Sequence, residues 1–159
     1  MSAILRKKND RAAARRAADI GRRVEYVSFS LAGEAYAVPI AHIAEILKPL
    51  PITPVPRAPR VVIGVMTVRG RLVTVFDLRR RLRLPESPLD QRSRILITDT
   101  GDERIGLLVD EVMQVHRLAE TEIEARDVLG GDPDPYIAGI GRPEGALLIL
   151  LDLRPILEA

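Results

Sequence analysis

The stretch GVMTVRGRLVTVFDLR, residues 64–79, decides the fold because a second copy of it occurs later in the chain. It aligns without a gap with GIGRPEGALLILLDLR, residues 139–154. The aligned pairs are Gly64 with Gly139, Gly70 with Gly145, Leu72 with Leu147, and Asp77-Leu78-Arg79 with Asp152-Leu153-Arg154. Upstream, residues 34–46 match residues 103–115 in their apolar spacing. The sequence therefore predicts a duplicated structure made from two copies of a small unit.

Each copy predicts a β-hairpin that is followed by a short capped helix. In the first copy, two apolar runs are separated only by Arg69-Gly70, and glycine accepts the positive φ of a two-residue turn. Asp77 ends the second run, where its carboxylate can cap a helix over residues 78–82. Asp152 is placed to cap the equivalent helix in the second copy. The first helix would bury its leucines, so we expect the arginines of residues 79–83 to be mostly solvated.

The remaining segments predict further strands, one helix and a connector. Residues 24–39 indicate two strands about a turn at Gly33. Residues 39–47, PIAHIAEIL, begin with proline and repeat isoleucine and leucine at helical spacing, which predicts a helix. Five prolines in residues 49–59 predict a stiff, extended connector. Residues 1–23 are rich in Ala and Arg and predict a flexible basic extension.

The composition limits both the fold and the chemistry. Hydrophobic residues make up 47% of the chain but aromatic residues only 3%, so Val, Ile, Leu and Ala must build the core, which favours strands. There is no cysteine, and no apolar run reaches the roughly 20 residues that span a bilayer. No signal-peptide pattern is present either. We therefore expect a cytoplasmic protein of mainly β structure.

No pattern in the chain indicates catalysis or metal binding. Glycine-rich phosphate loops and nucleophile-elbow motifs are missing from the sequence. The two histidines, His42 and His116, lack further ligands at a spacing that would complete a metal site. We expect no enzymatic activity, no cofactor and no metal.

Charge is distributed unevenly along the chain. Residues 1–23 carry eight Lys/Arg and two Asp, a net +6, and residues 57–83 carry eight Arg and one Asp, a net +7. Residues 84–159 carry seven Arg and sixteen acidic residues, a net −9. This asymmetry suits head-to-tail association with copies or relatives of the chain. The alternative is a small β-barrel that binds nucleic acid through residues 1–23 and 57–83.

Several motifs in order resemble one known family, the CheW-like domain of bacterial chemosensory systems. They begin with EYVSFSLAGEAYAVPIAHIAEI and continue with PRVVIGVMTVRGRLVTVFDLR. IGLLVDEVMQV, YIAGIG and LILLDL follow. The resemblance covers residues 24–159. In place of the family's usual Asn-Leu before Arg-Gly the chain has Thr67-Val68, and Thr74 stands where a proline is common.

The resemblance implies a fold of two five-stranded, SH3-like β-barrel lobes with short helices. They would fall at about residues 24–86 and 92–159, with exchange of strands between them left open. It implies a stand-alone, non-enzymatic adaptor that links the cytoplasmic tip of chemoreceptors to the regulatory domain of a CheA-type histidine kinase. A head-to-tail ring with that domain at membrane-associated receptor arrays is also implied. The family's receptor-facing positions fall on Ile43, Glu45, Gly64 and Arg69.

Arg69 also stands out on physical grounds. Asn or Asp is the usual choice for a two-residue turn, so turn chemistry does not explain an arginine there. We therefore expect Arg69 to be functional, paired with Glu45.

Overall fold

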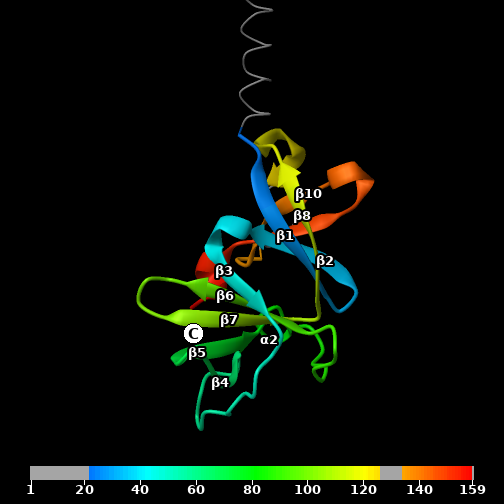
Figure 1. The fold of residues 1–159 in the computed structure, drawn as a ribbon. Helices are drawn as coiled ribbons and strands as arrows, with labels where there is room; N and C mark the ends of the chain where they lie inside the picture. Colours follow the sequence, from blue (N-terminus) through cyan, green and yellow to red (C-terminus); the bar gives the residue numbers. More distant parts are fainter. Residues whose placement is uncertain (1–21, 126–133, 159) are drawn as a thin grey trace, which may run out of the picture.

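The computed structural model describes residues 22–125 and 134–158 and contains two β-sheets, one above the other in Figure 1. Sheet A has the strand order β8-β1-β2-β11-β10-β9 and sheet B the order β3-β6-β7-β5-β4. The strands of sheet A are β1 (Val24–Leu31), β2 (Glu34–Pro39), β8 (Glu111–Leu118), β9 (Ile123–Ala125), β10 (Ile137–Gly141) and β11 (Leu148–Leu151). The strands of sheet B are β3 (Ile43–Leu47), β4 (Val62–Val68), β5 (Arg71–Asp77), β6 (Arg94–Asp99) and β7 (Arg104–Val109).

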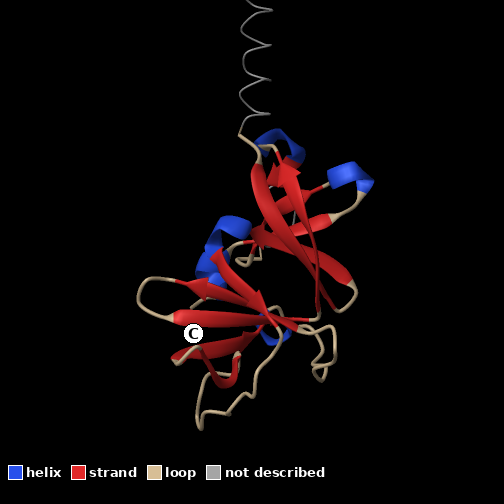
Figure 2. Cartoon of the chain, viewed as in Figure 1, coloured by secondary structure: helices blue, strands red, loops and turns tan. Residues whose placement is uncertain are grey.

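The predicted fold class is confirmed, since strands dominate the described residues and the helices are short (Figure 2). The helical segments are α2 (Leu78–Arg81), α3 (Leu153–Ile156) and the 3-10 turns η1 (Ile40–His42), η2 (Glu120–Glu122) and η4 (Pro143–Gly145). Sheet B has the predicted five strands, whereas sheet A has six because the short β9 pairs with β10. None of the helices in the described part of the chain is long and apolar enough to cross a membrane.

The duplication is visible in the strand pairing. β5 runs parallel to β7 with Thr74 opposite Ile105, and β11 runs parallel to β2 with Ile149 opposite Tyr36. The sequence alignment places Thr74 on Ile149 and Tyr36 on Ile105, so the two parallel pairs are equivalent. Sheet A combines β1 and β2 with strands from the second half of the chain, and sheet B combines β3, β4 and β5 with β6 and β7. Each sheet therefore takes strands from both halves.

The helix predicted for residues 39–47 is wrong. Only η1 is helical there, and residues 43–47 form β3, which pairs antiparallel with β6. Exposure alternates along β3, so Ile43, Glu45 and Leu47 are half-buried while the residues between them are exposed. The isoleucines fit both patterns locally, and the backbone hydrogen bonds that β6 supplies decide in favour of the strand.

The other local predictions in this half of the chain are confirmed. β1 and β2 form the hairpin about Gly33, and β4 and β5 form the hairpin about Arg69-Gly70. The proline-rich segment contains no strand and no helix. It forms only an isolated bridge, in which Thr53 pairs with Val65 of β4. Residues 1–21 lie outside the described residues, as does the prediction made for them.

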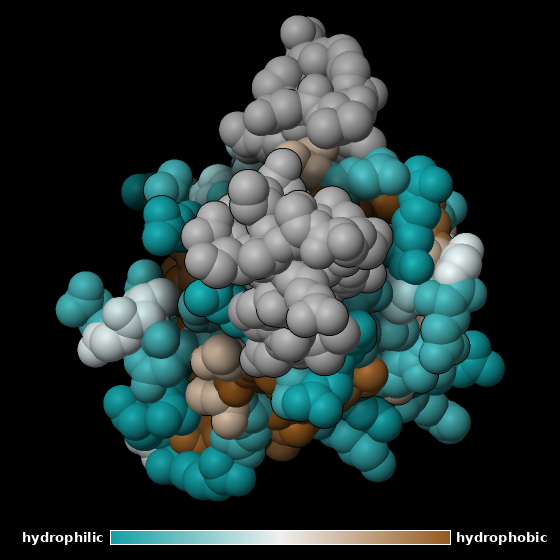
Figure 3. All heavy atoms as spheres, turned by 90° about the horizontal axis from the view of Figure 1, so that it is seen from above, coloured by the Kyte–Doolittle hydropathy of each residue, from teal (hydrophilic) through white to brown (hydrophobic). Residues whose placement is uncertain are grey.

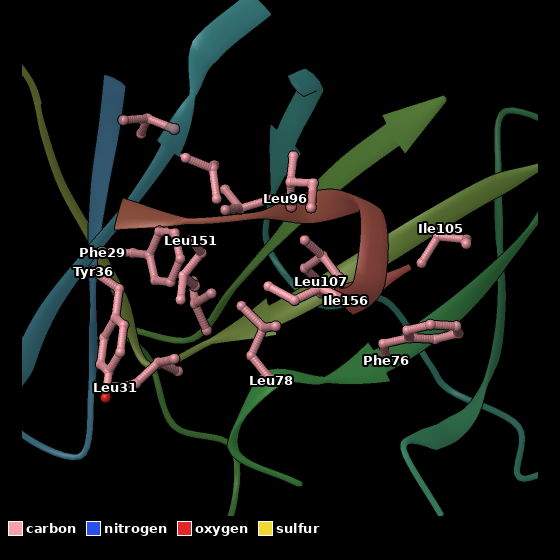
Figure 4. Close-up of a cluster of buried hydrophobic side chains, with 14 of the residues drawn as sticks. Phe29, Leu31, Tyr36, Phe76, Leu78, Leu96, Ile105, Leu107, Leu151 and Ile156 are labelled. Atoms are coloured by element: carbon pink, nitrogen blue, oxygen red, sulfur yellow. The ribbon is translucent and has the colours of Figure 1, made fainter. Parts of the chain in front are cut away.

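The largest hydrophobic cluster joins the two sheets. The view in Figure 4 shows side chains from β1, β2, β5, β7 and α3 converging in one cluster. Its buried members are Val27, Phe29, Leu31, Tyr36, Val38, Val61, Phe76, Leu78, Leu96, Ile105, Leu107, Val109, Leu151, Leu153 and Ile156. Sheet B keeps a smaller cluster of its own around Val73 and Ile97, and sheet A one around Leu118 and Leu150. In Figure 3 the described atoms around the edge of the molecule are mainly hydrophilic, with smaller hydrophobic patches between them.

Candidate partner-binding site

The turn between β4 and β5 holds Arg69 in an unusual backbone conformation. Arg69 has φ 50° and Gly70 has φ 77°, so both residues are left-handed, as a tight two-residue hairpin turn requires. The second copy repeats the two left-handed residues, with φ 51° at Glu144 and 82° at Gly145, but within a longer connection between β10 and β11. Arginine and glutamate both adopt this backbone conformation, so the backbone does not require an arginine at position 69. The reason for the arginine must therefore lie in the contacts of its side chain.

Arg69 forms a two-point ion pair with Glu45. Its Nη1 donates to Glu45 Oε2 at 2.7 Å, and its Nη2 lies 2.6 Å from Glu45 Oε1. The arginine side chain is 74% exposed, whereas the glutamate side chain is 22% exposed. The pair links the hairpin tip to β3, at the other edge of sheet B. An exposed pair stabilises a fold by only about 0–1 kcal/mol, so its main effect is to hold one guanidinium in a fixed position on the surface.

Ile43 lies two residues before Glu45 and belongs partly to the core. It is half-buried at the start of β3 and packs against the large cluster between the sheets. The structure therefore brings Glu45 and Arg69 together, with Glu45 on a strand rather than on the predicted helix, whereas Ile43 of the same strand packs against the core. Their contact with a partner stays a prediction.

Gly64 is buried, and its role in the structure is to let two backbones approach. A Cβ on Gly64 would lie 2.4 Å from the backbone oxygen of Thr53, in the connector. Thr53 and Val65 exchange two backbone hydrogen bonds of 2.8 and 2.9 Å beside it. The equivalent Gly139 has the same constraint, since its Cβ would lie 2.6 Å from the Glu124 oxygen. Gly64 thus positions β4 under the connector, and a direct contact between Gly64 and a receptor stays a prediction.

Both aspartates assigned to helix caps occupy cap positions. Asp77 Oδ1 accepts a hydrogen bond from the Arg79 N–H at 2.9 Å, and Asp152 Oδ1 accepts one from the Arg154 N–H at 3.1 Å. Asp77 is almost fully buried. Burial raises the pKa of the Asp77 carboxyl, and the bond from the Arg79 N–H and the charge of Arg80 offset only part of this rise.

The prediction that the arginines of residues 79–83 are mostly solvated is wrong for three of the four. Arg79, Arg80 and Arg81 are half-buried, and each is in contact with a carboxylate or an aromatic ring. Only Arg83 is exposed. The sequence pattern missed the contacts of Arg79 and Arg81 because Asp110 and Tyr136 lie 31 and 55 residues away. The partners of Arg80, Asp77 and Glu86, are close in the sequence, but helical periodicity does not report contacts with residues outside the helix.

These contacts also weigh against the nucleic-acid alternative. Within residues 57–83, Arg79, Arg80 and Arg81 are committed to partners inside the protein. Phe29, Tyr36 and Phe76, which could have stacked on bases, are buried in the core. These three arginines and three aromatic rings are therefore not available to a nucleic acid.

A hollow of about 370 Å³ lies between the two sheets. It is lined by Pro39 and His42 beside η1, by Thr98 at the end of β6, and by Leu151 and Leu157 around α3, among others. Within residues 22–125 and 134–158, no group of three or more His, Asp or Glu side chains is arranged to hold a metal ion.

Comparison with known proteins identifies the family. A family model described as a CheW-like domain matches residues 25–159. The chain belongs to the CheW-like domain family. The chemotaxis protein CheW of Bacillus subtilis is 33% identical over 142 residues, which cover 89% of this chain and 91% of the relative. The CheW of Thermotoga maritima is 31% identical over 144 residues, covering 89% and 92%.

A solved CheW structure has the same fold. The scaffolding protein TtCheW from Thermoanaerobacter tengcongensis superposes with a TM-score of 0.78 at 28% sequence identity. The superposition covers 86% of this chain and 94% of TtCheW. The resemblance seen in the sequence is thus confirmed, and the chain is a member of a family of chemotaxis scaffold proteins.

Proposed function

We propose that the chain is a non-enzymatic adaptor that couples chemoreceptors of the methyl-accepting type to a CheA-type histidine kinase. The observation that carries this proposal is the CheW-like match over residues 25–159, together with the likeness to a scaffolding protein. The adaptor would act in a chemosensory or motility pathway in the cytoplasm, at membrane-associated receptor arrays.

The receptor would bind at the inter-lobe surface near Ile43, Glu45, Gly64 and Arg69. Arg69 supports this placement because its guanidinium is exposed and yet held by two contacts to Glu45. A side chain that is already ordered loses less conformational entropy when a partner binds. The hollow between the sheets adds a recess that a partner side chain can enter.

The kinase regulatory domain would bind at the ends of the lobes. The net charges of +7 over residues 57–83 and −9 over residues 84–159 support a head-to-tail arrangement, because surfaces of opposite charge attract each other when copies or relatives of the chain associate. Leu147, beside the turn in the second copy, is 50% exposed. An exposed leucine at this turn gives such a contact an apolar centre.

Titration calorimetry with two ligands tests the proposal. The full chain is titrated with the cognate kinase regulatory domain and with a receptor-tip fragment. We expect micromolar binding to both, and Arg69→Glu should weaken the receptor titration at least tenfold, because it reverses the exposed charge and repels Glu45. The kinase titration should stay within twofold.

The matched control is Arg57→Glu, which makes the same change at another exposed arginine with positive φ, 61°. It should leave the affinity for the receptor-tip fragment unchanged. Absence of binding to both ligands by the folded, unsubstituted chain would rule the adaptor function out. An equal loss with Arg57→Glu would show that total charge, rather than Arg69, governs binding.

A further inference from the structure

Arg79 connects α2, which follows sheet B, to the point where the chain crosses into sheet A. Its Nε donates to Asp110 Oδ1 at 2.8 Å and its Nη2 to Asp110 Oδ2 at 2.5 Å, in a two-point pair. Asp110 is the single residue between β7 of sheet B and β8 of sheet A. The Arg79 side chain is 14% exposed and that of Asp110 29%. The pair is therefore largely shielded from water, where charged hydrogen bonds are strong.

Asp110 also binds the first hairpin of sheet A. Its Oδ2 accepts a hydrogen bond from the Ala32 N–H at 2.8 Å, and its own N–H donates to the Ser30 oxygen at 3.1 Å. Arg79 Nη1 donates to the Pro85 oxygen at 2.7 Å. One ion pair thus ties together α2, the segment after it, the β7–β8 crossover and the β1–β2 turn.

The balance of forces on Asp110 favours its charged form. Burial by itself would raise the pKa of the Asp110 carboxyl, but the hydrogen bonds from Arg79 and from the Ala32 N–H, with the charge of Arg79, hold this pKa below its ordinary value. The hydrogen bond to Asp110 in turn raises the pKa of Arg79.

The duplicated sequence shows that the helix cap alone does not require this arginine side chain. Arg79 is equivalent to Arg154, and both caps use only the backbone N–H of that position. The residue equivalent to Asp110 in the other copy is Ala41, which has no carboxylate. Arg154 is exposed and forms no ion pair with any residue in the described ranges. The second copy thus keeps the capped helix without the pair.

The next two arginines of α2 differ in their contacts: Arg81 contacts both sheets, whereas Arg80 contacts only the sheet B side. The Arg81 guanidinium lies 5.7 Å from the Phe76 ring centre in sheet B and 5.6 Å from that of Tyr136, just before β10 in sheet A. It also donates to the Glu158 oxygen near the C-terminus. Arg80 stays within the sheet B side, with Glu86 at 2.9 Å and the Arg60 oxygen at 3.0 Å. Arg80 is therefore a natural control for Arg79.

We propose that Arg79 and Asp110 are positioning residues that fix the orientation of the two lobes, and with it the inter-lobe surface that receives the receptor. The effect on the receptor surface rests on the proposed adaptor function, whereas the fixed orientation of the lobes does not. Asp110 leads directly into β8, so the pair sets the direction in which the chain passes from sheet B into sheet A. Its effect on the Glu45–Arg69 surface is therefore indirect.

A distance measurement between the lobes tests whether the Arg79–Asp110 pair, here called the brace, fixes their orientation, and it needs no partner protein. The chain has no cysteine, so cysteines at two exposed positions, Asp102 in the β6–β7 turn of sheet B and Ala146 in the β10–β11 connection of sheet A, take spin labels selectively. We expect a single narrow distance distribution in the parent chain. Asp110→Asn and Arg79→Gln should each broaden it at least twofold in width. The double variant should add little, because the two residues form one interaction.

Arg80→Gln is the matched control. It removes contacts of the same helix within sheet B, so it should leave the distribution unchanged even where it lowers stability. If a variant does not fold, Arg79→Lys takes its place and should give an intermediate width, because lysine keeps the charge but donates from a single nitrogen. An unchanged distribution in folded Asp110→Asn and Arg79→Gln, or the same broadening with Arg80→Gln, would overturn the brace.

Calorimetry separates the brace from the adaptor function. Asp110→Asn should weaken binding of the receptor-tip fragment about tenfold and leave binding of the kinase regulatory domain, which would contact the end of a lobe, within twofold. Equal weakening of both would contradict a specific effect on the inter-lobe surface. If the parent chain binds neither ligand, the adaptor function fails, and the distance distributions still decide the brace.

Discussion

Single residues in this protein owe their identity to two different requirements. Arg69 and Glu144 occupy the same turn position with φ near 50°, so the backbone tolerates either side chain. The surface decides between them, since Glu45 of β3 faces Arg69, whereas the equivalent of Glu45 in the second copy is Gln114. At Gly64 the backbone decides, because no side chain fits against Thr53. Sequence reasoning found both positions but attributed both to partner binding.

Substitution of Gly64 by alanine tests the packing role. The added Cβ would lie 2.4 Å from the Thr53 oxygen at a φ of 155°, so the connector must move away from β4. We expect Gly64→Ala to lower the free energy of unfolding by about 2 kcal/mol or more, measured by denaturant titration. Gly101→Ala is the control, since a φ of 93° also strains an alanine but nothing lies within 4 Å of the added Cβ. It should cost only about 1 kcal/mol, and equal losses would contradict the clash.

At the scale of elements, the sequence predicts what local chemistry determines. The hairpins about Gly33 and Gly70 and the caps at Asp77 and Asp152 depend on residues within a few positions of each other, and all four appear in the structure. β3 was missed because β6, which makes it a strand, follows about fifty residues later.

The arginines of α2 were misjudged for the same reason. A helical pattern shows which side of α2 carries leucine, but it does not show that Asp110 and Tyr136 cover the other sides. For the candidate site, the Glu45–Arg69 pairing was predictable, whereas the burial of Gly64 and the Arg79–Asp110 pair required the tertiary structure.

The cap of α2 combines a favourable hydrogen bond with an unfavourable buried charge. Asp77→Ala removes the acceptor for the Arg79 N–H and should cost about 1 kcal/mol of stability. Asp77→Asn keeps an acceptor oxygen but carries no charge. Because burial raises the pKa of Asp77 in the folded state, the aspartate stabilises the fold most below its unfolded pKa of about 4. That contribution is lost as pH rises through the folded pKa.

Denaturant titrations between pH 3 and pH 7 check the sign. The stability of Asp77→Asn relative to the parent chain should increase as pH rises through this window. A relative stability that instead falls with pH would mean that Arg80 and the helix N–H groups outweigh burial, and would contradict the raised pKa of Asp77.

At the scale of the whole molecule, the exchange of strands makes the two lobes interdependent. The first hairpin, β1–β2, lies between β8 and β11 in sheet A, and β6–β7 lie between β3 and β5 in sheet B. The largest hydrophobic cluster lies between the sheets rather than inside either one. Sheet B is thus built from one contiguous segment, residues 43–109, whereas sheet A joins strands that come before and after this segment, and the two sheets share their main core.

The lobes should consequently unfold in one transition. Leu107 of β7 is fully buried in the shared cluster, so Leu107→Ala should lower the free energy of unfolding by about 2–5 kcal/mol. Leu72→Ala makes the same change at a side chain that is 66% exposed and should cost less than about 0.5 kcal/mol.

Hydrogen exchange followed by mass spectrometry across a denaturant series measures this in each sheet separately. Peptides from β1–β2 report on sheet A and peptides from β6–β7 on sheet B. Their midpoints should coincide in the parent chain and move together in Leu107→Ala, because the substitution opens a cavity that both sheets line. Exchange of one peptide set at a lower denaturant concentration than the other would show that the lobes unfold independently. In that case the shared cluster would not be what couples them.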